Sequence, residues 1–197
     1  MAAKGLVCCS SGNLSQRLSD GNLLIKASRS WMESLTRANL SVCRIQDGHC
    51  LEGDKPSVET AFHAGILSVR HEARVVLHFQ SPYATVIACR KDARTLPFHI
   101  TAEMPYYIGS VGFVPFLLPG SAELARAVVE QAEQHAMILL ENHGQVTFGA
   151  SFEETIQRAV FFEMTCELIV RAGEQLRPLD PGDAEKLIAM SRSAKSV

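Results

Sequence analysis

Three short segments carry side chains that could act together on a small polar substrate: Glu59 at the end of residues 55–59, His78 and Gln80 in residues 78–80, and His143 in residues 142–144. Successive side chains of a strand point to opposite faces, so His78 and Gln80 should project from the same side. His143 precedes a glycine, where a turn could bring it toward them. Two imidazoles, an amide and a carboxylate around one pocket would suit a divalent metal ion with a general base beside it.

The same residues also have simpler explanations, which the residue types alone leave open. A histidine on a strand near a turn is often a structural residue that hydrogen-bonds inside the core. Glu59, in the first turn of an expected helix, could simply interact with the helix dipole, which contributes about 0.3–1 kcal/mol. The remaining histidines have no partner that the sequence identifies, and we expect structural or surface positions for them (His49, His63, His71, His99 and His135).

The composition is that of an ordinary soluble globular protein. Its 197 residues are 47% hydrophobic and 20% charged, which suits one domain, residues 1–197, with a sizeable core. The formal net charge of −2 gives no reason to expect nucleic acid or an anionic membrane as a partner. No apolar run approaches the roughly 20 residues of a membrane-spanning helix. No signal peptide is recognisable, so a cytoplasmic location is expected.

The six cysteines include no Cys-x-x-Cys pair. If Asp47-Gly48 forms a two-residue hairpin turn, Ile45 rather than Cys43 lies opposite Cys50. We therefore expect free thiols and no disulfide framework.

Apolar runs, helical spacing and helix-start signals predict the elements that must position these side chains. Strands are expected at residues 23–26, 75–79, 136–140 and 146–148, with a hairpin over 41–51. Helices are expected at residues 57–70, 81–90, 121–134, 151–172 and 183–190, whereas residues 96–118 match no clear pattern. The strand at 75–79 is apolar on both faces, which indicates a central position. Strands and helices mix without strict alternation, so the sequence predicts one sheet with helices on both faces and several antiparallel pairs.

Taken in order, four segments resemble the class II aldolase/adducin family. Residues 11–17 resemble its opening glycine-asparagine loop, and residues 55–63 resemble the helix start that carries its catalytic acid. Residues 78–84 lie where the family has a His-x-His pair followed by a helix, and residues 139–144 resemble the segment with its third histidine. The resemblance extends from Gly5 to about Ala172 and rests on the order and spacing of all four segments.

The resemblance implies a fold and an assembly. Members of this family form a three-layer α/β/α domain with a mainly antiparallel central sheet. They usually assemble as homotetramers with active sites at subunit contacts. We therefore expect an α/β chain of this architecture that forms a homo-oligomer.

The resemblance also implies a metal site, with one departure. The positions of the family's three metal-binding histidines correspond to His78, Gln80 and His143. An amide oxygen is a poorer zinc ligand than an imidazole nitrogen, so we expect weaker Zn²⁺ binding or an oxygen-tolerant ion such as Mn²⁺. Gln80 could instead hold a water molecule while the two histidines bind the ion, or the metal could have been lost.

Glu59 lies at the position of the family's aldolase base, where its epimerases carry Asp. By this resemblance the metal would hold the substrate's carbonyl and neighbouring hydroxyl and stabilise the enediolate, while Glu59 moves the proton. Tyr106 or Tyr107 could donate a proton, or could pack at a subunit contact.

The family's phosphate-binding positions correspond to a set of mostly small residues here (Ser11, Gly12, Asn13, Ser28, Arg29 and Ser57). Arg29 replaces a glycine, and Val58 replaces a second serine. The valine removes a donor, whereas the arginine adds a permanently charged fork suited to a carboxylate or phosphate. We therefore expect an anion to bind with a geometry different from that of fuculose phosphate.

The leading prediction is a metal-dependent aldehyde-lyase that cleaves a small phosphorylated or acidic sugar by a retro-aldol reaction. A sugar-phosphate dehydratase, decarboxylase or epimerase on the same scaffold is the second possibility. A non-catalytic module like the adducin head is the third. Gln80 favours the module, whereas the joint presence of Asn13, Glu59, His78 and His143 favours an enzyme.

Overall fold

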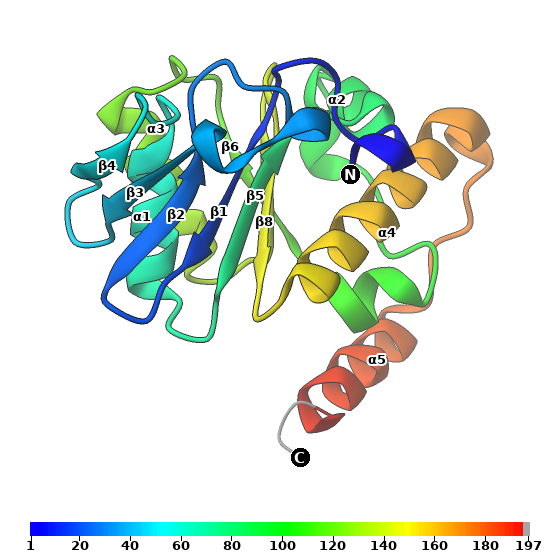
Figure 1. Ribbon diagram of the computed structural model, residues 1–197. Coiled ribbons are helices and arrows are strands. Elements are labelled where there is room, and N and C mark those ends of the chain that lie inside the picture. Colours follow the sequence, from blue (N-terminus) through cyan, green and yellow to red (C-terminus); the bar gives the residue numbers. More distant parts are fainter. Residues whose placement is uncertain (195–197) are drawn as a thin grey trace.

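The computed structural model describes residues 1–194, in which a single mixed sheet separates two layers of helices (Figure 1). Its eight strands lie in the order β4-β3-β2-β1-β5-β8-β7-β6. All neighbours are antiparallel except β6 and β7. The predicted α/β/α architecture with a mainly antiparallel sheet is therefore confirmed. The strands are β1 Asn13–Arg17, β2 Asn22–Lys26, β3 Leu40–Arg44, β4 Cys50–Gly53, β5 Val75–Phe79, β6 Val111–Val114, β7 Met137–Leu140 and β8 Gly144–Gly149.

Two helices cover each face of the sheet. On one face, α1 (Thr60–Val69) and α3 (Ala122–Ala132) share a buried cluster that includes Phe62 and Val128. On the other face, α2 (Pro82–Ala88) and α4 (Phe152–Ala172) share a second cluster that includes Ile87 and Phe162. A last helix, α5 (Pro181–Ala194), extends beyond the sheet and contacts the short π-helix η5 (Met104–Ile108). The short 3₁₀ turns are η1 Ala2–Lys4, η2 Met32–Ser34, η3 Arg37–Asn39, η4 Ala93–Thr95 and η6 Gly173–Gln175.

Strand β5 is the centre of the sheet, as its apolar sequence predicts. All five of its residues are buried, and it pairs with β1 on one side and β8 on the other. Helix α1 begins near the end of β5, so its first turn approaches the last residues of that strand. The start of α1 and the end of β5 therefore meet at one end of the sheet, and the residues predicted to form the site lie there.

The sequence does not predict two of the strands, β1 and β6, and each has an identifiable reason. In β1 the buried positions are the polar residues Asn13 and Ser15, so no apolar alternation marks the strand. β6 has four residues and contains Gly112, whose missing side chain lets Gln131 and His135 approach within about 3 Å of the position a Cβ would occupy. Its parallel pairing with β7 depends on contacts distant in sequence.

The register predicted for the β3–β4 hairpin is wrong. Cys43, not Ile45, lies opposite Cys50. The loop is longer than two residues because Arg44 pairs with His49 and Gly48 donates a backbone hydrogen bond to Arg44. The expectation of free thiols is confirmed, since all six cysteines are unpaired. No helix within residues 1–194 is both long and apolar enough to cross a membrane.

Candidate active site and metal centre

Glu59, His78 and His143 meet at the edge of the sheet where β5 ends. The Nε2 atom of His78 lies 3.4 Å from Glu59 Oε2, and the Nε2 atom of His143 lies 3.5 Å from Glu59 Oε1. The two imidazole rings are 4.8 Å apart, edge to face. Glu59 is 5% exposed and His78 is 1% exposed. Residues separated by up to 84 positions thus form one polar cluster inside an apolar core.

Local backbone features bring His143 to this cluster. It lies in the turn between β7 and β8, where Asn142 has a φ of 55°, a left-handed conformation that asparagine tolerates. Gly144 follows, and a Cβ at that position would lie 2.6 Å from the carbonyl oxygen of Phe79. Only glycine allows the turn to approach the end of β5 so closely.

A chain of buried hydrogen bonds holds Glu59. Asn13 Nδ2 donates to Glu59 Oε2 (2.8 Å), and Asn13 Oδ1 accepts from His63 Nε2. His63 Nδ1 then accepts from the hydroxyl of Ser15 (2.7 Å). Burial, helped by nearby His78, holds the pKa of His63 well below its usual value, which agrees with this neutral tautomer.

His63 is therefore more than an isolated structural residue, and its link to Glu59 was missed. The available signal is its position four residues after Glu59, which places both side chains on the same face of α1. Asn13 could not be recognised as its partner from spacing, because β1 is joined to α1 only through the fold.

His78 is oriented by its second nitrogen. Its Nδ1 donates to the carbonyl of Gln145 (3.0 Å), which leaves the lone pair of Nε2 facing the cluster. Gln80 projects from the same side, as the strand period predicts, and its Nε2 lies 2.7 Å from His78 Nε2. The Gln80 amide nitrogen therefore donates to the lone pair that a metal ion would use. Coordination through the Gln80 oxygen would require the amide group to turn over.

The cluster fits a divalent metal ion. Three of its buried polar atoms have no hydrogen-bond partner: Glu59 Oε1, Gln80 Oε1 and His143 Nδ1. Glu59, His78 and His143 each offer a ligand atom, and these atoms all lie within 4.8 Å of one another. Imidazole nitrogen and carboxylate oxygen are ligands that zinc and similar ions accept. Burial, and then His78, lower the pKa of His143, which favours the neutral form that binds metal, although Glu59 acts in the opposite direction.

The residues predicted to bind an anion divide into two groups. Asn13 contacts Glu59 directly, and Ser57 Oγ accepts from the Glu59 amide (3.3 Å). Gly12, with a φ of 72°, packs against β5, since a Cβ there would lie 2.7 Å from the carbonyl oxygen of His78. These three residues adjoin the cluster.

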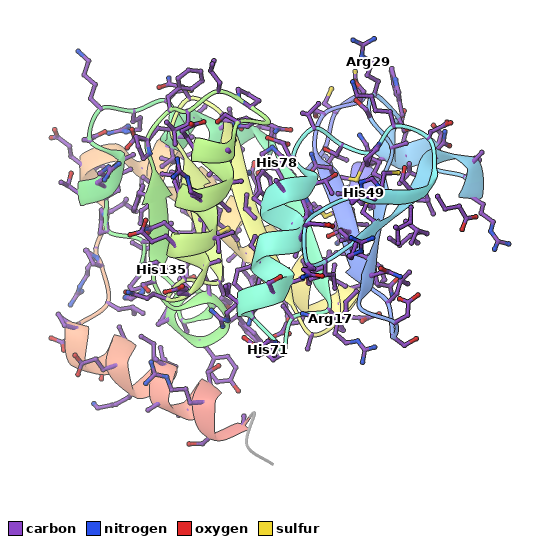
Figure 2. The ribbon with its side chains drawn as sticks, turned by 90° about the vertical axis from the view of Figure 1, so that its left-hand side faces the viewer. Arg17, Arg29, His49, His71, His78 and His135 are labelled. Atoms are coloured by element: carbon purple, nitrogen blue, oxygen red, sulfur yellow. The ribbon has the colours of Figure 1, made fainter. Side chains whose placement is uncertain are left out.

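The other predicted residues lie farther out. The Ser28 amide donates to the carbonyl of Lys55 (2.8 Å), which joins it to the segment leading to Glu59. Ser11 Oγ donates to the carbonyl of Cys8 (2.6 Å). Arg29 is exposed, has a φ of 64° and points outward at the edge of the molecule (Figure 2).

Lys26 is a second residue that the sequence did not identify. It is 2% exposed, and its Nζ donates to the carbonyls of Ser10 and Gly12, both at 2.9 Å. Burial lowers its pKa, and attraction to Glu59 opposes that change. The ammonium group thus fixes the loop that leads into Asn13. The only sequence signal is a lysine that directly follows three apolar strand residues.

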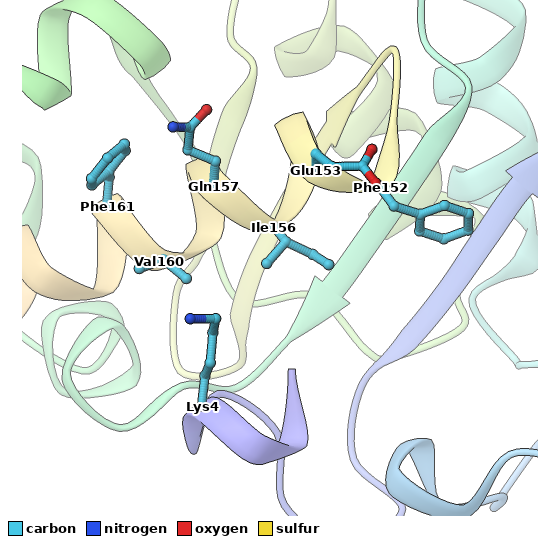
Figure 3. Close-up of a pocket in the computed structure, with 7 residues that line it drawn as sticks. All are labelled: Lys4, Phe152, Glu153, Ile156, Gln157, Val160 and Phe161. Carbon is cyan, nitrogen blue, oxygen red and sulfur yellow. The ribbon is translucent and has the colours of Figure 1, made fainter.

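Other candidate regions lack this chemistry. His49, His71 and His135 lie apart from His78, at the surface or in other layers (Figure 2). An apolar groove of about 380 Å³ runs along α4 (Figure 3) and contains none of the clustered residues. It is lined by Lys4, Phe152, Glu153, Ile156, Gln157, Val160 and Phe161.

Comparisons with known proteins find relatives along most of this chain. The family model for the class II aldolase and adducin N-terminal domain matches residues 1–170. The 3-oxo-tetronate 4-phosphate decarboxylase of Escherichia coli (strain K12) is 33% identical over 187 residues, covering 93% of this chain and 88% of that protein. The 5-methylthioribulose-1-phosphate/5-deoxyribulose-1-phosphate aldolase of Rhodospirillum rubrum is 34% identical over 164 residues, covering 83% and 72%.

Solved structures also superpose on most of this chain. YgbL from Escherichia coli superposes with a TM-score of 0.87 at 31% identity, covering 95% of this chain and 91% of that one. An L-fuculose 1-phosphate aldolase superposes with a TM-score of 0.83 at 22% identity, covering 97% and 90%, and this likeness concerns the fold alone.

Proposed function

Because this chain belongs to the class II aldolase and adducin family, we propose that it is a metal-dependent decarboxylase of a small phosphorylated 3-oxo sugar acid. The observation that carries the proposal is the buried Glu59–His78–His143 cluster, whose unpartnered atoms suit a metal ion and a proton carrier. The choice of reaction is supported by similarity to 3-oxo-tetronate 4-phosphate decarboxylases over 93% of the chain. Retro-aldol cleavage, the leading prediction from the sequence, becomes the second candidate and is supported by the aldolase relative.

The chemistry needs a sink for one electron pair and a source for one proton. When the C1–C2 bond of a 3-oxo-tetronate 4-phosphate breaks, CO₂ leaves and its bonding electrons pass toward the C3 carbonyl. Addition of a proton at C2 then gives dihydroxyacetone phosphate. A divalent ion held by His78 and His143, with Glu59 or Gln80 as a further ligand, would polarise the C3 carbonyl. Zn²⁺ is the proposed ion, with Mn²⁺ as the alternative that an amide ligand favours.

Glu59 is the proposed proton carrier. Asn13 occupies Glu59 Oε2, whereas Oε1 is buried without a hydrogen-bond partner. Oε1 is therefore the atom available to exchange a proton with the substrate. In decarboxylation the protonated form would deliver a proton to C2. In a retro-aldol reaction the carboxylate would instead take a proton from a substrate hydroxyl, so the same atom serves both candidate reactions.

The anionic group of the substrate is proposed to bind between Ser28, Ser57 and the loop of residues 11–13, with Arg29 at the outer edge. Lys26 adds positive charge behind this loop, where its ammonium group donates to the carbonyls of Ser10 and Gly12. A homotetramer and a cytoplasmic location remain predictions from the sequence and the family resemblance.

The test is a product assay on protein supplemented with Zn²⁺ or Mn²⁺. With 3-oxo-tetronate 4-phosphate, the proposal predicts CO₂ and dihydroxyacetone phosphate in equal amounts, and loss of both in Glu59→Gln. Dihydroxyacetone phosphate plus an aldehyde from a ketose 1-phosphate, without CO₂ from the oxo acid, would identify an aldolase instead. Dehydration or epimerisation of the sugar phosphate would identify the remaining enzyme alternatives. No turnover of any of these substrates by metal-loaded protein would favour the non-catalytic module.

A further inference from the structure

Cys8 and Cys9 form an exposed pair of adjacent thiols whose sulfur atoms lie only 3.6 Å apart. In an extended chain, adjacent side chains point to opposite sides, so this proximity requires an unusual backbone. Cys9 has a φ of 54°, in the left-handed region that residues other than glycine rarely adopt. The left-handed residue turns the chain so that both sulfurs face the same way.

The turn that carries the pair is held from two sides. Ser11 donates to the carbonyl of Cys8 through its amide (3.0 Å) and through its hydroxyl (2.6 Å). Lys26 binds the carbonyls of Ser10 and Gly12 from within the protein. These contacts fix the backbone that carries the two sulfurs. Residues held in a rarely adopted backbone conformation, as Cys9 is, cluster at functional sites.

The spacing suits two sulfurs that share one thiophilic atom. Two thiolates bound at about 2.3 Å to one tetrahedral ion are about 3.8 Å apart. A structural zinc ion would need further ligands, but the only cluster of three or more such side chains within residues 1–194 is Glu59, His78 and His143. A trivalent organoarsenical carries its own carbon ligand and requires only two sulfurs.

We propose that Cys8 and Cys9 form a dithiol binding site for trivalent organoarsenicals, at the base of the loop that leads into Asn13. An arsenoxide reacts with the two thiols to form two As–S bonds, and its oxygen leaves as water with the two thiol protons. No oxidant or reductant is consumed. The site is independent of the proposed catalytic function.

The other cysteines lack the same combination of exposure and proximity. Cys43 and Cys166 are buried, and burial raises the pKa of Cys43 to about 12. Cys50 lies opposite Cys43 and is half-buried, so these two residues are the competing pair. Cys89 is exposed but forms no described contact with another thiol, which makes it the matched control.

The experiment measures binding of phenylarsine oxide to the full chain, reduced with a phosphine, by intact-protein mass spectrometry. We expect one adduct per chain in the wild type and in Cys89→Ser, and at least a tenfold loss of occupancy in Cys8→Ser and in Cys9→Ser. A competing dithiol should remove the adduct, whereas an equal concentration of a monothiol should not. Circular dichroism confirms that each variant is folded.

Three adduct measurements would overturn the proposal. They are an adduct that persists in Cys8→Ser, an adduct abolished by Cys50→Ser, or no adduct at an excess of reagent. Recovery of Cys8 and Cys9 as an internal disulfide despite the phosphine would also do so, because the pair would then be a redox site.

Discussion

Charged side chains are buried at both ends of the central sheet, but the two groups differ in how fully their polar atoms are hydrogen-bonded. Where β5 begins, Arg158 donates to the carbonyls of Tyr107 (3.0 Å) and Phe148 and pairs with Glu154 (2.7 Å). Arg17, at the same end, donates to three carbonyls of residues 67–73. Where β5 ends, the Glu59 cluster leaves three buried polar atoms without a partner.

The difference separates a stabilising network from a ligand site. A buried polar atom without a hydrogen bond costs about 1–3 kcal/mol, so folding alone does not favour the arrangement around Glu59. The arginines instead satisfy carbonyl groups that would otherwise be unpaired. Substitutions at the two ends should therefore have opposite signatures: loss of stability at one and loss of activity at the other.

The largest effect is expected for Glu59→Gln. Removal of the proton carrier should lower kcat by about 10²–10⁴-fold, the usual contribution of general acid–base catalysis. The melting temperature should be unchanged or higher, because a buried charge is removed. Steady-state kinetics and thermal unfolding measure both, with the exposed Glu153→Gln as the control. Retention of more than a tenth of the wild-type rate would remove Glu59 from the mechanism.

Arg158→Met tests the stabilising network at the end of the sheet where β5 begins. The change leaves the carbonyls of Tyr107 and Phe148 and the carboxylate of Glu154 without the guanidinium, so the free energy of unfolding should fall by about 3 kcal/mol. Metal affinity and kcat, measured below the melting transition, should stay within twofold of the wild type. Urea unfolding of Arg158→Met and of the exposed Arg126→Met gives the comparison. Equal stability of the two variants would contradict the role assigned to this network.

Gln80→His sharpens the description of the metal site. A third imidazole in place of the amide should raise Zn²⁺ affinity by about 10–100-fold and raise Mn²⁺ affinity less, because zinc favours nitrogen ligands. Titration calorimetry with both ions measures the change. An unaltered Zn²⁺ affinity would mean that the side chain at position 80 does not reach the ion.

The smallest effect concerns pH and the buried His63. Its pKa is lowered in the folded state, so below a pH of about 6.5 the unfolded chain binds a proton that the folded chain does not. Stability of the metal-free protein should therefore fall as the pH drops below that value, by up to about 1.4 kcal/mol per pH unit for this group. His63→Gln should show a shallower dependence between pH 6.5 and 5 than His71→Gln, in which an exposed histidine is replaced. Parallel curves would contradict the assignment.

The sequence was sufficient where function depends on local pattern. The period of a strand placed His78 and Gln80 on one side, and local sequence patterns located β5, α1 and α4. It was insufficient where polar residues are buried by partners distant in the chain. Asn13 and Ser15 made β1 look like a loop, and the ammonium group of Lys26 gave no sign that it holds two carbonyls. The register of the β3–β4 hairpin could not be predicted either, because backbone hydrogen bonds around Arg44 lengthen the loop.

The central claim is that His78 and His143 hold one divalent ion beside Glu59, and elemental analysis after dialysis against Zn²⁺ or Mn²⁺ tests it most directly. The account predicts about one ion per chain in the wild type and in Arg158→Met, and at least a tenfold loss in the double variant His78→Ala/His143→Ala. A wild-type protein that retains neither ion, or a double variant that binds as much as the wild type, would contradict it.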